Sequence, residues 1–322
     1  MEKPVYNVKP VLEGGILTAI AVIFALMSAY LPLVGSFMTF VWPMPIIILG
    51  VRHGYKWSVM AALSSGIIIA LLVHPLQALS IVICFAVIGI VIAHGIRQGY
   101  APLKILFFGT AASLVSKLAF LGVMMAVTGI NPMEFNAQAI NDIFIKSIEF
   151  YRGLGVNEQT LQRTMELSQQ MLELAPILIP TALLMSAVMD TYLNFYLGRV
   201  ILNKLGHKNL PGFPLFKTWQ MPRGTIYALA VAMLMMYWGQ TREISLLYSA
   251  GVNLQIISTV MLLIQGTALA YFLASKYNIS GAKTGIVLMV MLFTGLLTQV
   301  LIFAGIFDLL FDYRKLNQPR GS

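Results

Sequence analysis

The sequence has 322 residues, of which 58% are hydrophobic and only 10% are charged, and its mean hydropathy is +0.82. This composition excludes an ordinary soluble domain and indicates an integral membrane protein. The net charge of +9 does not point to a nucleic-acid partner, because the basic residues lie in short clusters at the ends of apolar stretches.

Nine apolar stretches are candidates for membrane helices, each of which needs roughly 20 residues to cross the hydrocarbon core. They lie at 13–34, 36–51, 56–73, 75–96, 103–128, 174–202, 223–240, 245–275 and 284–312. The second is short and carries Pro43 and Pro45, so we expect it to be broken or to span only in part. The pattern predicts an all-α polytopic bundle of about 8–9 membrane helices. We divide the chain into a six-helix unit at 1–202, a loop at 203–222 and a three-helix unit at 223–322.

The distribution of Lys and Arg predicts the orientation in the membrane. With the N-terminus in the cytoplasm, the cytoplasmic segments hold thirteen of the 21 basic residues, as expected for a protein of the bacterial cytoplasmic membrane. The exception is the C-terminal tail, which an odd number of spans would place outside although it carries Arg314, Lys315 and Arg320. Either the last helix does exit, or one of the nine stretches does not span.

The first apolar stretch carries small residues at regular spacing. Ala21, Ala25 and Ala29 follow one another at intervals of four and therefore share one face of a helix. Small residues let a second membrane helix approach closely. We expect this face either to dock on another membrane subunit or to pack inside the chain as ordinary core.

Lys117 interrupts the apolar stretch 103–128 and needs a partner. It lies fourteen residues beyond Leu103, or about 21 Å along a helix. Asp190 lies twelve residues before Leu202 on the returning helix, or about 18 Å. Opposite charges at similar depth on antiparallel neighbours predict an intramembrane ion pair, since an isolated charge there costs several kcal/mol. The pair either locks the two helices together or takes part in binding a polar ligand.

The segment 129–173 is the one long external connection and has the pattern of an amphipathic helical insert. Asn131, Pro132 and Glu134 are typical of a helix start. "GLG" at 153–155 interrupts the pattern, after which a second apolar stripe continues towards Pro176 and Pro180. The insert is either a pair of helices lying on the bilayer surface or a lid over an outward-facing pocket.

The cytoplasmic segment "NKLGHKNLPGFPLFKTWQMPRG" at 203–224 combines prolines with aromatic and basic residues. The prolines forbid a regular helix, and the aromatic and basic side chains favour the headgroup layer. The segment is either an interfacial linker or a docking site for a protein partner.

The sequence offers little that supports an enzyme. "SGAKTG" at 280–285 lacks the earlier glycine and the preceding strand of a phosphate loop, so it predicts only a helix start. None of the four histidines pairs at helical spacing with a second ligand, so we expect no metal and no cofactor. A membrane-embedded transferase that acts on lipids stays open, because its site can be built from scattered residues that sequence spacing does not reveal.

After the alanine face, the stretch 42–66 holds Pro45, Gly50 and Gly54 and then the small residues Ala61, Ala62, Ser65 and Gly66. This order of motifs resembles the substrate-binding S components of energy-coupling-factor transporters. In that family an Ala-x3-Ala face on the first helix docks on a coupling subunit, and a proline- and glycine-marked second helix precedes a small-residue third. The corresponding stretch here is "WPMPIIILGVRHGYKWSVMAALSSG". The whole chain, with its "LPGFPLFKTWQMP" loop, resembles the YybS-like family of bacterial membrane proteins. It departs from S components in adding about three helices and a long external insert.

The resemblance implies a ligand-binding or transport-type subunit without its own ATPase, which works with a membrane coupling subunit and ATPases. The alternative is a scaffold or regulatory protein that assembles other membrane components. A transport-type subunit is expected to hold a small polar or amphipathic ligand in a polar-lined cavity on the external side of the first six helices. Polar and aromatic groups on an apolar wall orient a ligand, and the candidates are Tyr30, Trp42, His74 and Gln77. Taken singly, each is equally typical of an interfacial anchor.

Overall fold

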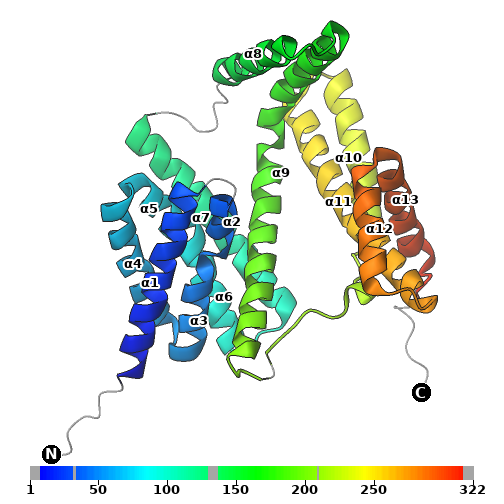
Figure 1. Cartoon of the computed structure of the whole chain (residues 1–322). Helices are drawn as coiled ribbons and strands as arrows, with labels where there is room; N and C mark the ends of the chain where they lie inside the picture. The colour runs from blue at the N-terminus through cyan, green and yellow to red at the C-terminus, as the bar shows by residue number, and fades with distance from the viewer. Residues whose placement is uncertain (1–7, 32–33, 130–136, 209, 315–322) are drawn as a thin grey trace, which may run out of the picture. The chain divides into compact units, whose positions relative to one another are not determined.

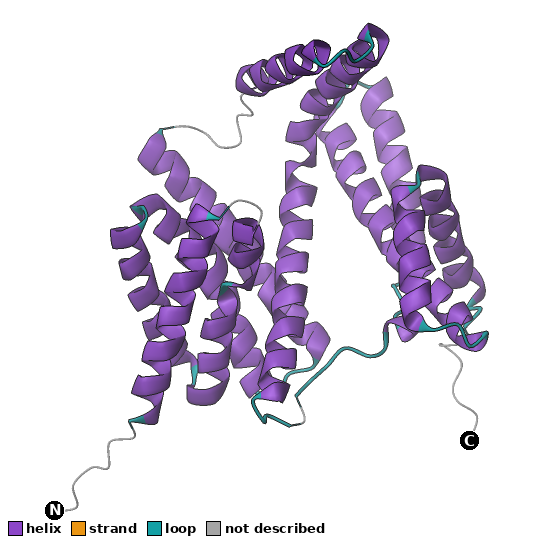
Figure 2. Cartoon of the chain, in the orientation of Figure 1, coloured by secondary structure: helices purple, strands orange, loops and turns teal. Residues whose placement is uncertain are grey.

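The computed structural model describes residues 8–31, 34–129, 137–208 and 210–314, and within these ranges it contains helices and no strand (Figure 2). The predicted start of the insert at Asn131, Pro132 and Glu134 lies outside the described residues. The chain is an all-α polytopic membrane protein, as its apolar periodicity predicts. Contacts divide it into two compact units.

Unit 1 comprises residues 1–135 and 182–212. It contains the first helices of the chain and the second part of α9 (Figure 1). The helices are α1 (Lys9–Tyr30), α2 (Val34–Val41), α3 (Pro43–His53), α4 (Tyr55–Leu72), α5 (Pro75–Ile81), the π-helix η1 (Val82–Ala86), α6 (Val87–Arg97), α7 (Pro102–Thr128) and α9 (Glu158–Lys204).

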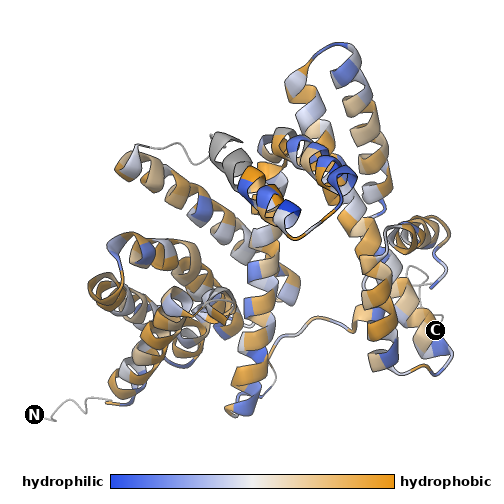
Figure 3. Ribbon diagram, turned by 45° about the horizontal axis from the view of Figure 1, so that its top comes forward, coloured by the Kyte–Doolittle hydropathy of each residue, from blue (hydrophilic) through white to orange (hydrophobic). Residues whose placement is uncertain are grey.

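Unit 2 comprises residues 136–181 and 213–322. Its elements are α8 (Ala137–Gly153), the first part of α9, the 3-10 turn η2 (Phe216–Thr218), α10 (Gly224–Thr241), α11 (Ser245–Lys276), α12 (Gly281–Phe293) and α13 (Gly295–Phe311). Hydropathy follows these elements: apolar residues predominate on the long helices, whereas α8 and the start of α9 carry many hydrophilic ones (Figure 3).

Six helices of the described chain are long and apolar enough to cross a membrane, and a seventh span follows if the bent pair α12–α13 is counted as one. This is fewer than the 8–9 expected from the sequence. The stretch 36–51 breaks into α2 and α3 ahead of Pro43, and the stretch 284–312 bends by 114° between α12 and α13. The stretch 223–240 forms α10, which has only 18 residues and ends in polar ones.

The core of unit 1 is made by small residues of α1 and α4 packed against the large side chains of α3. Ala21 and Ala25 are 0% exposed and belong to the same cluster as Trp42 and Ile46. The expected docking face on α1 is therefore corrected: Ala21 and Ala25 are covered by the chain's own helices, because α3 and α4 pack against α1. Ala29, nearer the end of the helix, is only partly buried.

Unit 2 is held together by close approach of α11 and α13. A Cβ atom added to Gly266 would lie 1.8 Å from the Leu301 carbonyl oxygen, and one added to Gly305 would lie 2.1 Å from the Leu262 carbonyl oxygen. Only glycine fits at both positions, as is typical of small-residue interfaces between membrane helices.

The insert belongs to unit 2 and not, as the sequence-based division has it, to the first six helices. One reason lies at the two prolines of α9. Directly after Pro180, the Asn253 side chain of α11 accepts a hydrogen bond from Thr181 N (3.0 Å) and donates one to the Ile177 carbonyl (2.7 Å). These two backbone groups face each other across one helical turn, so Asn253 inserts into the backbone ladder of α9.

Candidate functional site

The structure brings Lys117 and Asp190 together in unit 1. The Lys117 ammonium on α7 donates hydrogen bonds to Asp190 Oδ2 at 2.6 Å and to Ser186 Oγ at 2.8 Å, both on α9. The side chains of Lys117 and Asp190 are 14% and 2% exposed. A charged pair at this depth in an apolar helix bundle is a site of functional interest in its own right.

Glycine and threonine allow α7 and α9 to approach closely beside this pair. A Cβ atom on Gly109 would lie 2.3 Å from Thr191 Cγ2, so a larger residue would push the helices apart. The Thr191 hydroxyl donates to the Ala187 carbonyl of its own helix at 2.9 Å and needs no further partner. Because the two helices are in close contact, polar side chains of both are buried in the interface between them.

Around the ion pair, several buried oxygen atoms have no hydrogen-bond partner within the described protein. They are Thr110 Oγ1, Ser113 Oγ, Asp190 Oδ1 and Asn194 Oδ1. Ser113 and Asn194 are 0% exposed. The Asn194 amide nitrogen is already used, since it donates to the Asp190 carbonyl at 2.8 Å. We call these four residues, with Lys117 and Ser186, the α7–α9 polar cluster.

The spacing of the polar cluster explains why it forms. Thr110, Ser113 and Lys117 follow at intervals of three and four on α7, and Ser186, Asp190 and Asn194 follow at intervals of four on α9. Each set therefore shares one helix face. The carboxylate and amide oxygens accept hydrogen bonds, and the hydroxyls can do either. The oxygen atoms that have no partner suit a molecule that carries hydrogen-bond donors.

A π-helix also packs against α7. Val82–Ala86 forms this element within the span Pro75–Arg97, and it contacts α7. It holds Cys84, the only cysteine of the chain, which is buried and free. Single π turns inside α-helices occur frequently at functional sites.

The four residues expected to contact a ligand differ in their burial. Trp42 is 0% exposed and lies in the hydrophobic core of unit 1, so the expectation that it contacts a ligand is corrected. His74 is exposed and caps α5, its Nδ1 accepting from Leu76 N at 3.2 Å. Tyr30 is 65% exposed and donates to the Leu72 carbonyl at 3.5 Å. Gln77 is partly buried on α5.

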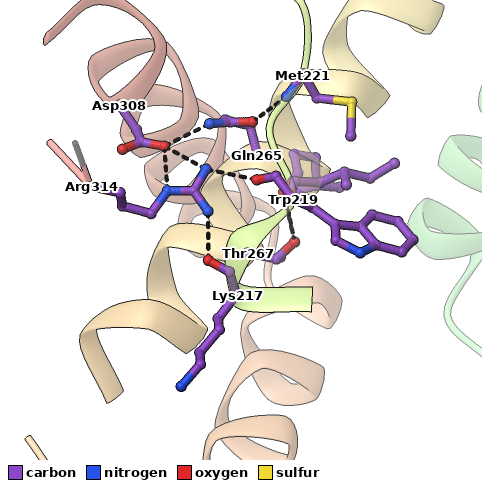
Figure 4. Close-up of polar contacts among 9 residues, drawn as sticks. Lys217, Trp219, Met221, Gln265, Thr267, Asp308 and Arg314 are labelled. Atoms are coloured by element: carbon purple, nitrogen blue, oxygen red, sulfur yellow. Dashed lines mark hydrogen bonds and ion pairs between the residues drawn. The ribbon is translucent and has the colours of Figure 1, made fainter. Parts of the chain in front are cut away.

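Unit 2 contains a second buried polar network that sequence reasoning missed. The Arg314 guanidinium, whose side chain is 0% exposed, is paired with Asp308 Oδ2 at 2.8 Å and donates to the Lys217 and Trp219 carbonyl oxygens at 2.8 Å each (Figure 4). Gln265 of α11 donates to Asp308 at 2.6 Å and accepts from Met221 N at 2.8 Å. The network fastens the segment 213–222 to α11 and α13.

The signal for this network was present in the sequence. Gln265 and Asp308 interrupt apolar stretches just as Lys117 does, but their partners lie in a loop and beyond a helix end, where counting depth along helices gives no answer. Aromatic contacts add to the attachment, with the Phe216 ring 5.1 Å from Trp219 and 5.5 Å from Tyr271. The segment is therefore packed against α11 and joined to Arg314, which follows α13.

The network also fixes which ends of the helices share a membrane face. Lys217 and Arg314 are in contact, and the Lys217 ammonium donates to Ser275 Oγ at the end of α11 at 2.9 Å. Residues this close lie on the same side of a membrane. The pair α12–α13 therefore begins and ends at the same end of unit 2, which favours a re-entrant loop over a broken span for this bent pair. The end of α13 then lies on the same side as Lys217.

The insert begins in the described residues with α8, which ends at Gly153, as the "GLG" pattern predicts. Gly155 has a φ of +82°, and the turn is closed by an exposed ion pair between Arg152 Nε and Glu158 Oε1 at 2.6 Å. The hydrogen bond to Glu158 raises the pKa of Arg152 above its ordinary value. Buried Ile148 and Leu161 continue the predicted apolar stripes.

Within the described residues, no group of three or more His, Cys, Asp or Glu side chains is arranged to hold a metal ion. The fold and the buried polar clusters define a polytopic helical membrane protein. Residues 19–309 match the model of the family described as "Predicted membrane protein (DUF2232)", and the chain belongs to that family. It is 22% identical over 269 residues to the "Uncharacterized protein YybS" of Bacillus subtilis (strain 168), covering 83% of this chain and 85% of the relative. No solved structure matches it.

Proposed function

We propose that this protein is a ligand-binding membrane subunit of the transport type, with no ATPase of its own, and that the α7–α9 polar cluster is its ligand site. The observation that carries the proposal is the set of buried oxygen atoms without partners beside Lys117 and Asp190. A bridge that only locked two helices would need the ion pair and nothing more. The additional acceptors support binding of a small molecule with hydrogen-bond donors.

The polar cluster should be lower in free energy with a hydrogen-bonding ligand bound than without one. Leaving a buried polar group without a hydrogen bond costs about 1–3 kcal/mol. Ser113, Asp190 and Asn194 each contain such an atom, and each of these residues is at most 2% exposed. A ligand that donates hydrogen bonds to them would recover this cost and would be specific for its donor pattern.

The proposed partners are a membrane coupling subunit and its ATPases, because a chain without a nucleotide motif needs another source of energy to move a ligand uphill. This part rests on the resemblance to S components. Since Ala21 and Ala25 are buried in unit 1, a coupling subunit would have to contact a different surface from the one the resemblance implies.

The test is a thermal-shift screen of the purified full chain over vitamins, polar metabolites and lipid headgroups, repeated on two variants. Ser113→Ala removes a buried hydroxyl without a partner, so the ligand-free variant should be as stable as the wild type or more so, while the shift produced by a hit is lost. Thr225→Ala is the matched control, because Thr225 Oγ1 is also buried without a partner but belongs to unit 2.

Equal loss of the shift in both variants would contradict the assignment of the site. If no compound shifts the wild type, and pull-down from native membranes recovers other membrane proteins instead, the scaffold alternative replaces this proposal.

A further inference from the structure

An apolar groove runs along the outer surface of unit 2 between α11 and α13. Its volume is about 690 Å³, and its walls include Leu269 and Leu273 of α11 and Val300, Phe303 and Phe307 of α13. From Val300 to Phe311 it follows eleven residues of α13, or about 16 Å of helix, and it continues past the helix end to Tyr313. This exceeds the roughly 15 Å that one leaflet contributes to the hydrocarbon core, so the groove can hold an acyl chain along its full length.

Basic residues lie at one end of the groove. Tyr313 lines that end, and the Lys276 ammonium lies 5.9 Å from the centre of its ring. Lys217 is close by, because its ammonium contacts Ser275, the neighbour of Lys276. Arg314 adds no free charge, since Asp308 neutralises it. Lys276 and Lys217 contribute two positive charges and Asp312 one negative charge, so these described residues carry a net positive charge.

This end of the groove lies on the face that Lys217 shares with the end of α13. By the positive-inside rule that face is cytoplasmic. The cytoplasmic leaflet carries anionic lipids, and basic pockets between membrane helices on that side bind their headgroups. A tyrosine at the mouth is typical of the headgroup level.

We propose that the α11–α13 groove is a binding site for an anionic phospholipid, whose acyl chain lies along Phe303 and Phe307 and whose phosphate is held by Lys276 and Lys217. The site is independent of the α7–α9 polar cluster and lies wholly in unit 2. The lipid would hold the segment 213–222, α11 and α13 at one leaflet.

The experiment measures the thermal stability of the purified, delipidated full chain in detergent with added phosphatidylglycerol or phosphatidylcholine of identical acyl chains. The wild type should gain about 3 °C or more from phosphatidylglycerol over phosphatidylcholine. Lys276→Gln alone and combined with Lys217→Gln should abolish the difference. Lys283→Gln is the matched control, an exposed lysine in the first turn of α12, and this variant should keep the difference.

Ala304→Trp fills the groove with a bulky side chain and should reduce stabilisation by both lipids, because Ala304 lines its wall. Equal stabilisation of the wild type by the two lipids would overturn the proposal, as would loss of the preference in Lys283→Gln to the same extent as in Lys276→Gln. Glycerol phosphate serves as a headgroup without chains, and a shift as large as that of the lipid would refute the role of the groove.

Discussion

Replacing Lys117 by alanine would leave Asp190 buried with no partner for either carboxylate oxygen. Asp190 Oδ2 is bonded by Lys117 at 2.6 Å, and Oδ1 has no partner within the described protein. Removing one member of a buried pair costs about 3–5 kcal/mol, so we expect Lys117→Ala to lower the free energy of unfolding by about 3 kcal/mol. Asp190→Ala should cost less, about 2 kcal/mol, because Lys117 keeps Ser186 and is 14% exposed.

The double variant separates pairing from two independent losses. Without either charge, only the packing defects left by the two truncated side chains remain. We therefore expect the double variant to lose about 2 kcal/mol of unfolding free energy, where additive effects would give about 5, so the coupling energy is about 3 kcal/mol. The assay is reversible unfolding in mixed micelles, followed by fluorescence. A double-variant cost within about 0.5 kcal/mol of the sum would show that the two residues do not stabilise each other. Ser186→Ala, expected to cost about 1 kcal/mol, calibrates a single hydrogen bond.

Three further predictions concern topology and packing. Cysteines placed near Arg97, Lys208 and Arg320 should all be protected from an impermeant thiol reagent in intact cells, while one near Glu158 should react; labelling near Arg320 alone would refute the re-entrant loop. Ala25→Trp should reduce the yield of folded protein, whereas Ile23→Trp should be tolerated, because Ala25 is 0% and Ile23 is 52% exposed. If the Ala25→Trp protein is instead folded but has lost a copurifying partner, the alanine face binds another protein and the packing argument is wrong. Gly266→Ala should destabilise unit 2 by about 2 kcal/mol or more, and Gly295→Ala, which has open space around it, should not; equal effects on thermal stability would show that α11 and α13 do not need close contact.

The helical membrane fold and the ion pair were accessible from the sequence because both depend on local patterns. Apolar runs of sufficient length predict helices, and depth along two consecutive antiparallel stretches predicts which charges meet. Lys117 and Asp190 satisfied both conditions. The number of spans was less accessible, because a break at Pro43 and a bend at Thr294 interrupt apolar runs without changing their composition.

Sequence reasoning failed where a residue's role depends on which helix lies opposite. Ala21 and Ala25 have the same spacing whether their face meets a partner protein or the chain's own α3 and α4. Trp42 is apolar enough for the core and polar enough for a site, and only packing decides between them. The Arg314 network joins a loop, two helices and the end of the last helix, a combination that no periodic pattern encodes.

Among the described residues, the buried carboxylates Asp190 and Asp308 have similar cationic partners but different surroundings. Around Asp308, the Arg314 side chain donates three of its hydrogen bonds to fixed protein acceptors, and Gln265 uses both ends of its amide. One oxygen, Asp308 Oδ1, is left without a partner there. Such a network is nearly complete in itself and holds the segment 213–222 in place. Around Asp190, oxygen atoms from two helices stay open although they are equally buried. In unit 1 a ligand could donate hydrogen bonds to these oxygen atoms, whereas in unit 2 it would have to displace hydrogen bonds that the protein already forms.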